Sequence, residues 1–376
     1  MLNDSAKFRT CPNTPYIDTC RLLPSQPTIN DMSPLEVLRA AAAGLAHHPH
    51  DHGWRDLYGL FDYGLTHSGT ELKHALIESY EQRPVGAAHL LTLLGIALKV
   101  EAADKFADLA GKGPLEGRLV VLEDVLVLRG DTISHVLLSR QNSFTCARRF
   151  LVPGVILRAY FSRYPHQPIN FADLGTGLGI LPRQLNSERE YDTFCDELLW
   201  PNGVPEFRHL PIASAFGVDR GPMPTTKWVH ACYGSSEYYA VLYDELQASL
   251  NDPEVKNASV QYRELDLLDS AALASFIRDN KINAANLSYV LYELEPLQRQ
   301  NTLEVIMREL RTPGLVIVTE PRDELHREGC VVEVFCNDQP DPLTLCFVSD
   351  GHFTGYVLPL DDYDEFVRKY PISYRE

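Results

Sequence analysis

The sequence predicts an α/β fold in which a mostly helical N-terminal region precedes a sheet of mainly parallel strands. A short apolar run from Ile169 to Leu174 leads into a turn with three glycines at every second position, Gly175, Gly177 and Gly179. This pattern is typical of a buried strand, a permissive loop and a helix N-terminus. Further short apolar runs alternate with helical stretches as far as residue 321. That alternation favours a parallel sheet.

Length and composition indicate a globular chain of up to two domains. The 376 residues are 45% apolar and 23% charged, which is ordinary for such proteins. Eighteen consecutive apolar residues occur nowhere, so we expect no membrane span. The N-terminus lacks the basic and then apolar pattern of a signal peptide, and a cytoplasmic location is therefore expected.

The acidity of the chain makes nucleic acid an unlikely substrate. The formal net charge is −17, and binding to nucleic acid depends on Lys and Arg side chains that neutralise phosphates. One cluster of arginines could begin a basic patch: Arg140, Arg148, Arg149 and Arg158.

Neither the cysteines nor the histidines predict a metal site. The eight cysteines are scattered without a Cys-x-x-Cys pair, which argues against structural zinc and iron–sulfur sites. Four histidines and one aspartate lie between His47 and His52, but Pro49 breaks helical spacing among them. A solvated helix end explains this cluster better than a metal ion does.

Residues 1–30 are rich in proline and predict an irregular arm. Residues 31–165 predict a mostly helical cap, which begins at a capping box formed by Ser33 and Glu36. Within the cap, the β-branched run between 117 and 130 predicts a hairpin or a short strand pair. Asn142 leads into a helix that reaches Tyr164. The arm and the cap together favour a homodimer.

Residues 166–376 predict the sheet domain. After the glycine loop, strands are expected at 213–218, 260–265, 282–290 and 314–321, with antiparallel strands at 331–336, 343–349 and 355–359. One aromatic helix is expected to contain Trp228 and Tyr243. The acidic, proline-containing insert 187–211 is interpreted either as a lid over the site or as a surface insertion.

Three carboxylates lie beside the ends of successive predicted strands. Asp173 precedes the glycine loop, Asp219 ends the second strand, and Asp266 follows the third. A carboxylate can accept two hydrogen bonds, so Asp219 is suited to both hydroxyls of a ribose. Asp269 is better placed as the N-cap of the next helix.

The Asp-x-Gly-x-Gly-x-Gly run from Asp173 to Gly179 resembles the first motif of the class I S-adenosylmethionine-dependent methyltransferases. The third glycine arrives one position too early for the dinucleotide fingerprint. The resemblance implies a seven-stranded Rossmann-like sheet with the methionine moiety over the turn, Asp219 on the ribose and Asp266 on the adenine amino group. It also implies a reaction centre at the end of the fourth strand. The cofactor-binding residues that it implies are Asp173, Gly175, Thr176, Gly177, Gly179, Asp219, Asp266, Ser288 and Tyr289.

Two weaker resemblances concern longer segments. The segments 140–149 and 217–222 resemble a bacterial family of methyltransferase-like domains of unknown function. The segments 288–294 and 316–321 resemble the ribosomal small-subunit methyltransferase-like family. These families imply different substrates but the same fold and the same cofactor.

The expected activity is methyl transfer from S-adenosylmethionine to oxygen or nitrogen of a small metabolite. The candidate bases are His230, Tyr292 and Glu293, although a lone histidine on an aromatic helix is more often a core residue. The alternatives are a methyltransferase acting on RNA or the ribosome and a non-catalytic binding protein that retains the fold. The sequence does not identify the acceptor.

Overall fold

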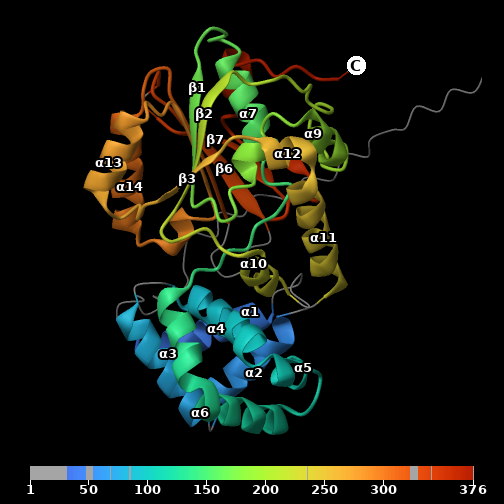
Figure 1. Ribbon diagram of the computed structural model, residues 1–376, viewed down its shortest axis with the longest axis vertical. Coiled ribbons are helices and arrows are strands. Elements are labelled where there is room, and N and C mark those ends of the chain that lie inside the picture. Colours follow the sequence, from blue (N-terminus) through green and yellow to red (C-terminus); the bar gives the residue numbers. More distant parts are fainter. Residues whose placement is uncertain are drawn as a thin grey trace, which may run out of the picture.

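The computed structural model describes residues 32–47, 54–67, 69–83, 86–234, 236–321, 329–339 and 341–375. A helical cap and an α/β sheet domain are stacked along the long axis of the molecule (Figure 1). The predicted arm at 1–30 lies outside the described residues, as does the histidine cluster apart from His47. The structure therefore does not describe those two features.

Six helices form the cap, and their apolar faces pack around one core. The predicted capping box is confirmed, because the Ser33 side chain accepts from the backbone N–H of Glu36 while the Glu36 carboxylate accepts from Ser33 N. The central helix is α4, which is buried on nearly every side. The cap helices are α1 (Pro34–Ala46), α2 (Arg55–Thr66), α3 (Thr70–Gln82), α4 (Ala87–Glu101), α5 (Ala103–Leu109) and α6 (Leu115–Ser139).

The strand pair predicted between 117 and 130 is wrong, because this segment belongs to the long helix α6. Its apolar residues are buried at helical spacing: Leu119, Leu122, Val125 and Leu126 face the core. The β-branched side chains suggested a strand, but the 3.6-residue period of burial decides the structure. The helix is kinked at Arg129.

A mixed eight-stranded sheet forms the second layer, in the order β3-β2-β1-β4-β5-β6-β7-β8. Strands β1 to β5 are parallel, and β6 to β8 continue the sheet in antiparallel fashion. The strands are β1 (Ile169–Leu174), β2 (Ile212–Asp219), β3 (Gln261–Glu264), β4 (Ala284–Ser288), β5 (Leu315–Pro321), β6 (Cys330–Cys336), β7 (Leu343–Val348) and β8 (Val357–Pro359).

The sheet therefore differs from the seven-stranded expectation within the described residues. All three antiparallel tail segments join the same sheet, and β6 pairs directly with β5. Eight strands result because the last short segment, β8, completes the edge beside β7.

Helices cover both faces of the sheet. On one face, α13 (Ser270–Asp279) and α14 (Pro296–Glu309) pack against apolar side chains of β1, β2, β4 and β5. As predicted, Asp269 caps α13 by accepting from Ala272 N at 3.0 Å. The opposite face carries α7 (Leu151–Phe161), α8 (Leu181–Gln184), α9 (Glu188–Cys195) and α15 (Tyr363–Lys369). Helix α7 lies within the predicted cap range 31–165, yet it packs on the sheet.

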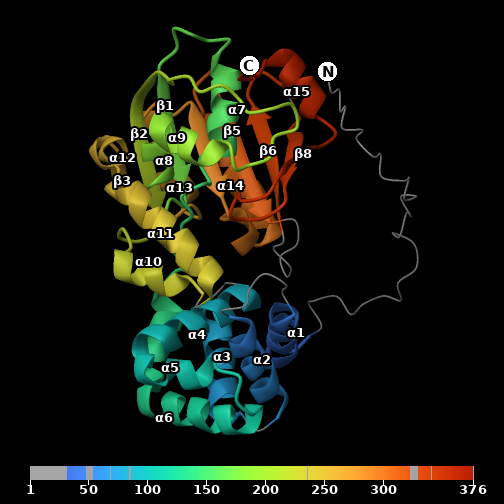
Figure 2. The same ribbon diagram turned by 90° about the vertical axis from the view of Figure 1, so that its right-hand side faces the viewer.

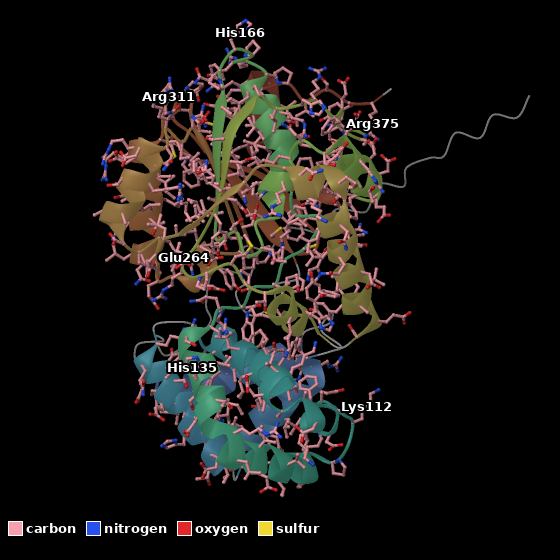
Figure 3. The ribbon with its side chains drawn as sticks, viewed as in Figure 1. Lys112, His135, His166, Glu264, Arg311 and Arg375 are labelled. Atoms are coloured by element: carbon pink, nitrogen blue, oxygen red, sulfur yellow. The ribbon has the colours of Figure 1, made fainter. Side chains whose placement is uncertain are left out.

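The parallel strands point their carboxyl ends at the cap. His166, which precedes β1, lies at the end of the molecule farthest from the cap, whereas Glu264, the last residue of β3, lies on the cap-facing side (Figure 3). Because β1 and β4 are neighbours at the centre, the strand order reverses there. Open α/β sheets bind ligands outside the carboxyl ends at such a reversal.

Two helices replace the single aromatic helix that was predicted. They are α10 (Thr226–Cys232) and α11 (Glu237–Asn251), with the short α12 (Pro253–Asn257) behind them. Ser236 begins the second helix by accepting from Tyr239 N. Helix α10 lies between the sheet and the cap (Figure 2), and its Trp228, Ala231 and Cys232 belong to the cap core.

The insert 187–211 packs on the α7 face of the sheet and at its β8 edge. It contains α9 and forms isolated bridges from Leu199 to Tyr356 and from Pro205 to Tyr374. Its apolar residues Tyr191, Phe194 and Leu198 join the core on the α7 face. These contacts place it among the C-terminal segments and agree with a surface insertion, not with a lid. Over the described ranges, none of the helices is both long enough and apolar enough to cross a membrane.

Candidate functional site

A cavity of about 330 Å³ lies between the carboxyl ends of the strands and the cap. Ten of the twelve residues predicted for the site line it. They come from the glycine loop, the ends of β2 and β4, and the segment after β3. They are Asp173, Gly175, Thr176, Gly177, Asp219, Asp266, Ser288, Tyr289, Tyr292 and Glu293.

Two predicted site residues do not line this cavity. Gly179 belongs to the loop but faces away from it. His230 is exposed on α10, where its ring contacts the ring of Tyr243 at a centroid distance of 4.4 Å. Histidine was a candidate base because its ordinary pKa is near neutrality. However, the His230 side chain points outward from α10 and does not reach the cavity.

The three glycines of the loop all adopt left-handed backbone conformations. Their φ angles are +82° at Gly175, +55° at Gly177 and +63° at Gly179, which side chains other than glycine rarely adopt. A Cβ atom on Gly175 would collide with Val290, and one on Gly177 would lie 2.9 Å from Thr145 Oγ1. The predicted need for glycine is thus both conformational and steric.

Four of the five N–H groups from Gly175 to Gly179 are already used within the protein. Gly175 N and Thr176 N donate to Val218 O at 2.8 and 3.0 Å, and Gly179 N donates to Thr176 O. Gly177 N donates to Asp219 Oδ2 at 2.9 Å. The loop therefore holds the ends of β1 and β2 together, and these four donors are not directed at a ligand.

Asp173 holds the glycine loop through a hydrogen bond with Thr176. It is 4% exposed and accepts hydrogen bonds from Thr176 Oγ1 at 2.6 Å and from Asn286 Nδ2 at 2.8 Å. Burial raises the pKa of Asp173 to about 6, although both hydrogen bonds and the positive charge of Arg149 oppose the rise. The role of Asp173 is to connect β1, β4 and the loop.

Asp219 and Asp266 form the next part of the wall. Asp219 Oδ1 accepts from Arg220 N at 2.8 Å, and its other oxygen accepts from Gly177 N. Burial raises the pKa of Asp219 above its ordinary value, with these two backbone donors opposing the rise. Asp266 Oδ2 lies 3.1 Å from Arg220 Nε. Each carboxylate oxygen has two acceptor sites, so Asp219 retains acceptor capacity toward the cavity.

The end of β4 makes a tight turn, which a buried carboxylate holds in place. Glu320 on β5 accepts from the backbone N–H groups of Val290, Leu291 and Tyr292 at 3.2, 2.8 and 3.2 Å. Burial raises the pKa of Glu320 to about 7, against these three donors. Tyr289 has a φ of +58°, an uncommon value for a bulky residue and a sign of a functional constraint.

Tyr292 and Glu293 reach the cavity from this turn. Tyr292 Oη donates to Glu293 Oε1 at 3.0 Å, and His89 Nδ1 of α4 lies 2.8 Å from the same oxygen. His89 is 2% exposed, whereas Glu293 is 22% exposed. Glu293 thus joins the cap to the sheet domain and keeps one side toward the cavity.

Sequence reasoning missed His89, which binds Glu293, and the cap-side wall of the cavity. This wall consists of Leu45, Trp54, Tyr58 and Thr92. A signal for His89 and Thr92 was present, because they are the only polar residues between 87 and 98. They are three positions apart and so share one helix face. As predicted, the segment that begins at Asn142 leads into a helix, α7, and residues 141–146 run without regular structure along the cavity.

The four arginines of the predicted basic cluster are separated. Arg148 binds Glu245 in a bidentate manner and also pairs with Glu197. Arg158 donates to two backbone carbonyls in the core, and Arg140 lies over the ring of Trp228. Only Arg149 lines the cavity. These contacts do not create an exposed basic surface.

The part of the chain that the structure describes contains no group of three or more His, Cys, Asp or Glu side chains that could hold a metal ion. The described cysteines at 146, 195, 232, 330, 336 and 346 are buried thiols. No protein-family model matches the chain, and no curated protein matches its sequence.

Proposed function

We propose that this protein is an S-adenosylmethionine-dependent methyltransferase that acts on a small molecule. One observation carries the proposal: a loop whose three glycine N–H groups are occupied lies between the buried Asp173 and the half-buried Asp219, at the reversal of strand order. The loop offers close backbone approach with few donors for an anion.

The occupied donors argue against a dinucleotide. A pyrophosphate is bound at a helix N-terminus by free backbone N–H groups. Here Gly175, Thr176 and Gly177 donate to Val218 and Asp219, and the helix that follows, α8, has only four residues. Asp219 would also repel a pyrophosphate placed on the loop.

The charges around the cavity suit a ligand with positive charge. Asp173, Asp219, Asp266 and Glu293 line it, against the guanidinium groups of Arg149 and Arg220. S-adenosylmethionine carries a sulfonium and an ammonium group, so an acidic wall favours it over nucleotides with phosphate groups. When bound, it would supply an electrophilic methyl group.

The residues present fit this cofactor. Asp219, with acceptor capacity left on both oxygens, would hold the ribose hydroxyls. Asp266 would accept from the adenine amino group, and the glycines would allow the methionine moiety to approach the backbone. A cavity of about 330 Å³ is at the lower end of the range for one small ligand.

Glu293 is the group best placed to remove a proton from the acceptor. It lines the cavity and is 22% exposed, and His89 and Tyr292 hold its Oε1 atom in position. A base of this kind contributes about 10² to 10⁴ in rate when the acceptor carries a proton. Tyr292 is the alternative base, through the hydroxyl that now donates to Glu293.

The first experiment is calorimetric titration of the full chain with S-adenosylmethionine, S-adenosylhomocysteine, NAD⁺ and ATP. We compare the wild type with Asp219→Asn, which nearly preserves shape but loses one acceptor. Asp279→Asn is the matched control, since Asp279 is 71% exposed and does not line the cavity. We expect Asp219→Asn to weaken cofactor binding about 10- to 100-fold, as loss of a charged hydrogen-bond partner does.

Absence of binding to both adenosyl ligands, or tighter binding of NAD⁺, would overturn the proposed cofactor. If the cofactor binds, methyl-labelled S-adenosylmethionine is then incubated with a small-metabolite extract and, separately, with ribosomal subunits and total RNA. Label in small molecules supports the proposal. Label in RNA supports the alternative substrate, and label in neither indicates a non-catalytic binding protein.

A further inference from the structure

We propose that Arg149 recognises a carboxylate group of the ligand that occupies the cavity. This inference rests on the proposed function and adds a chemical requirement to it. Arg149 lies in the turn immediately before α7, and it lines the cavity.

The protein fixes the guanidinium of Arg149 from one side. Its Nε donates to Gly351 O at 3.1 Å, and its Cζ atom lies 4.2 Å from the ring centroid of Tyr289 and 5.4 Å from that of Phe144. Stacking and one hydrogen bond preorganise the planar group, so little side-chain entropy is lost when a ligand binds.

The two outer nitrogens of Arg149 are not used by the protein. Among the described residues, no hydrogen bond or ion pair involves its Nη1 or Nη2. The neighbouring Arg148 differs, since Glu245 and Glu197 already bind its Nε and Nη2. A fixed guanidinium with unused donors in a cavity matches the geometry of a carboxylate, which it can bind in a bidentate manner.

The surrounding charge favours a carboxylate over a phosphate. Four carboxylates line the same cavity, so a dianionic group would meet stronger repulsion than a monoanionic one. The positive charge of Arg149 also acts on Asp173, which supports the glycine loop, and opposes the rise in the pKa of Asp173 caused by burial. Arg149 thus lies near both the loop and the end of β4.

A carboxylate at this position has two chemical sources. One is the amino-acid end of the cofactor, and the other is the acceptor. The first arm of the test measures binding of S-adenosylmethionine and of its decarboxylated analogue to the wild type, Arg149→Gln, Arg149→Lys and Arg140→Gln. Arg140→Gln is the matched control, because Arg140 also stacks on an aromatic ring but does not line this cavity.

If the carboxylate is that of the cofactor, the wild type prefers S-adenosylmethionine to its decarboxylated analogue about 10- to 100-fold, the usual effect of a hydrogen-bonded charge. Arg149→Gln abolishes the preference, Arg149→Lys keeps part of it, and Arg140→Gln leaves it unchanged. Thermal unfolding of each variant confirms that it is folded.

The second arm uses the protein saturated with S-adenosylhomocysteine and measures the thermal shift caused by benzoate and by its neutral analogue benzamide. If the carboxylate belongs to the acceptor, benzoate stabilises the wild type more than benzamide does, and Arg149→Gln removes the difference. Equal behaviour of wild type and Arg149→Gln in both arms overturns the proposal for Arg149. Failure of the wild type to bind any adenosyl ligand overturns the proposed cofactor instead, so the two failures are distinguishable.

Discussion

The wall of the cavity that belongs to the sheet is polar and acidic, whereas the wall that belongs to the cap is aromatic and uncharged. Asp173, Asp219 and the glycine loop come from strand ends that the sheet places side by side. Trp54, Tyr58 and Thr92 come from two different helices of the cap. Under the proposed function, the first wall would fix the cofactor by hydrogen bonds, and the second would select the acceptor by shape.

The largest expected effect concerns Glu293, where the two walls meet. We expect Glu293→Gln to lower methyl transfer about 10²- to 10⁴-fold, because a general base is lost, while cofactor affinity stays within about threefold. The measurement is formation of S-adenosylhomocysteine in the presence of the acceptor. The control is Glu304→Gln, an exposed position on α14. Equal losses in cofactor affinity and rate would assign Glu293 to the cofactor wall instead.

The next prediction tests the requirement for glycine at position 175 in the sheet wall. Gly175→Ala places a methyl group against Val290 at a φ of +82°, so overpacking and backbone strain should together lower the free energy of unfolding by about 4 kcal/mol. Adding Val290→Ala should restore part of this loss, since only the strain remains. Urea unfolding measures both variants. Gly221→Ala is the control, because a Cβ there meets nothing within 4 Å. A neutral Gly175→Ala would contradict the steric argument.

A pH-dependent effect tests the buried carboxylate on the same side. The pKa of Asp173 is about 6 in the folded protein and about 4 when unfolded, so the protonated form is favoured by folding. The contribution of Asp173 to the free energy of unfolding is complete below pH 4. It is lost as the pH rises through 6, which lowers the free energy of unfolding by about 3 kcal/mol.

Asp173→Asn should remove this dependence. Its free energy of unfolding relative to the wild type should therefore rise between pH 4 and pH 7 and stay level above. Urea unfolding at several pH values within that window supplies the measurement. Parallel curves for the two proteins would show that the ionisation of Asp173 is not linked to folding.

The smallest effect concerns the cap side. Tyr58 Oη lies 3.1 Å from Thr92 Oγ1 in the buried wall. Tyr58→Phe should lower the free energy of unfolding by about 1 kcal/mol, the usual net value of such a bond, and leave cofactor affinity unchanged. Tyr63→Phe is the control, because Tyr63 donates to Glu116 in a more exposed position. A large loss of cofactor affinity in Tyr58→Phe would break the division between the two walls.

The sequence allowed the sheet side to be predicted because its residues lie in short contiguous patterns. The run from Asp173 to Gly179 contains a strand end, a loop and a carboxylate, and Asp219 follows an apolar strand directly. In these segments, residues that are adjacent in the sequence are also adjacent in the site. The prediction for His230 was wrong because the helix that carries it turns the side chain outward.

The cap side could not be predicted in the same way. His89 and Glu293 are more than two hundred positions apart, and no local pattern relates them, yet their side chains meet at 2.8 Å. In α6 the β-branched composition suggested strands, although burial at helical spacing was already present in Leu119, Leu122 and Leu126. In that segment the spacing of the apolar residues, and not their β-branched composition, indicates the structure.

Helix α10 also affects the order in which the chain can fold during synthesis. Trp228 and Cys232 complete the cap core, yet they follow the last cap helix by nearly ninety positions. The ribosome therefore releases all of α1 to α6 before the residues that close their core exist. Until Cys232 has emerged, the apolar side chains of the cap that Trp228 and Cys232 later contact stay uncovered. A fragment that ends at Ser139 would keep those side chains exposed.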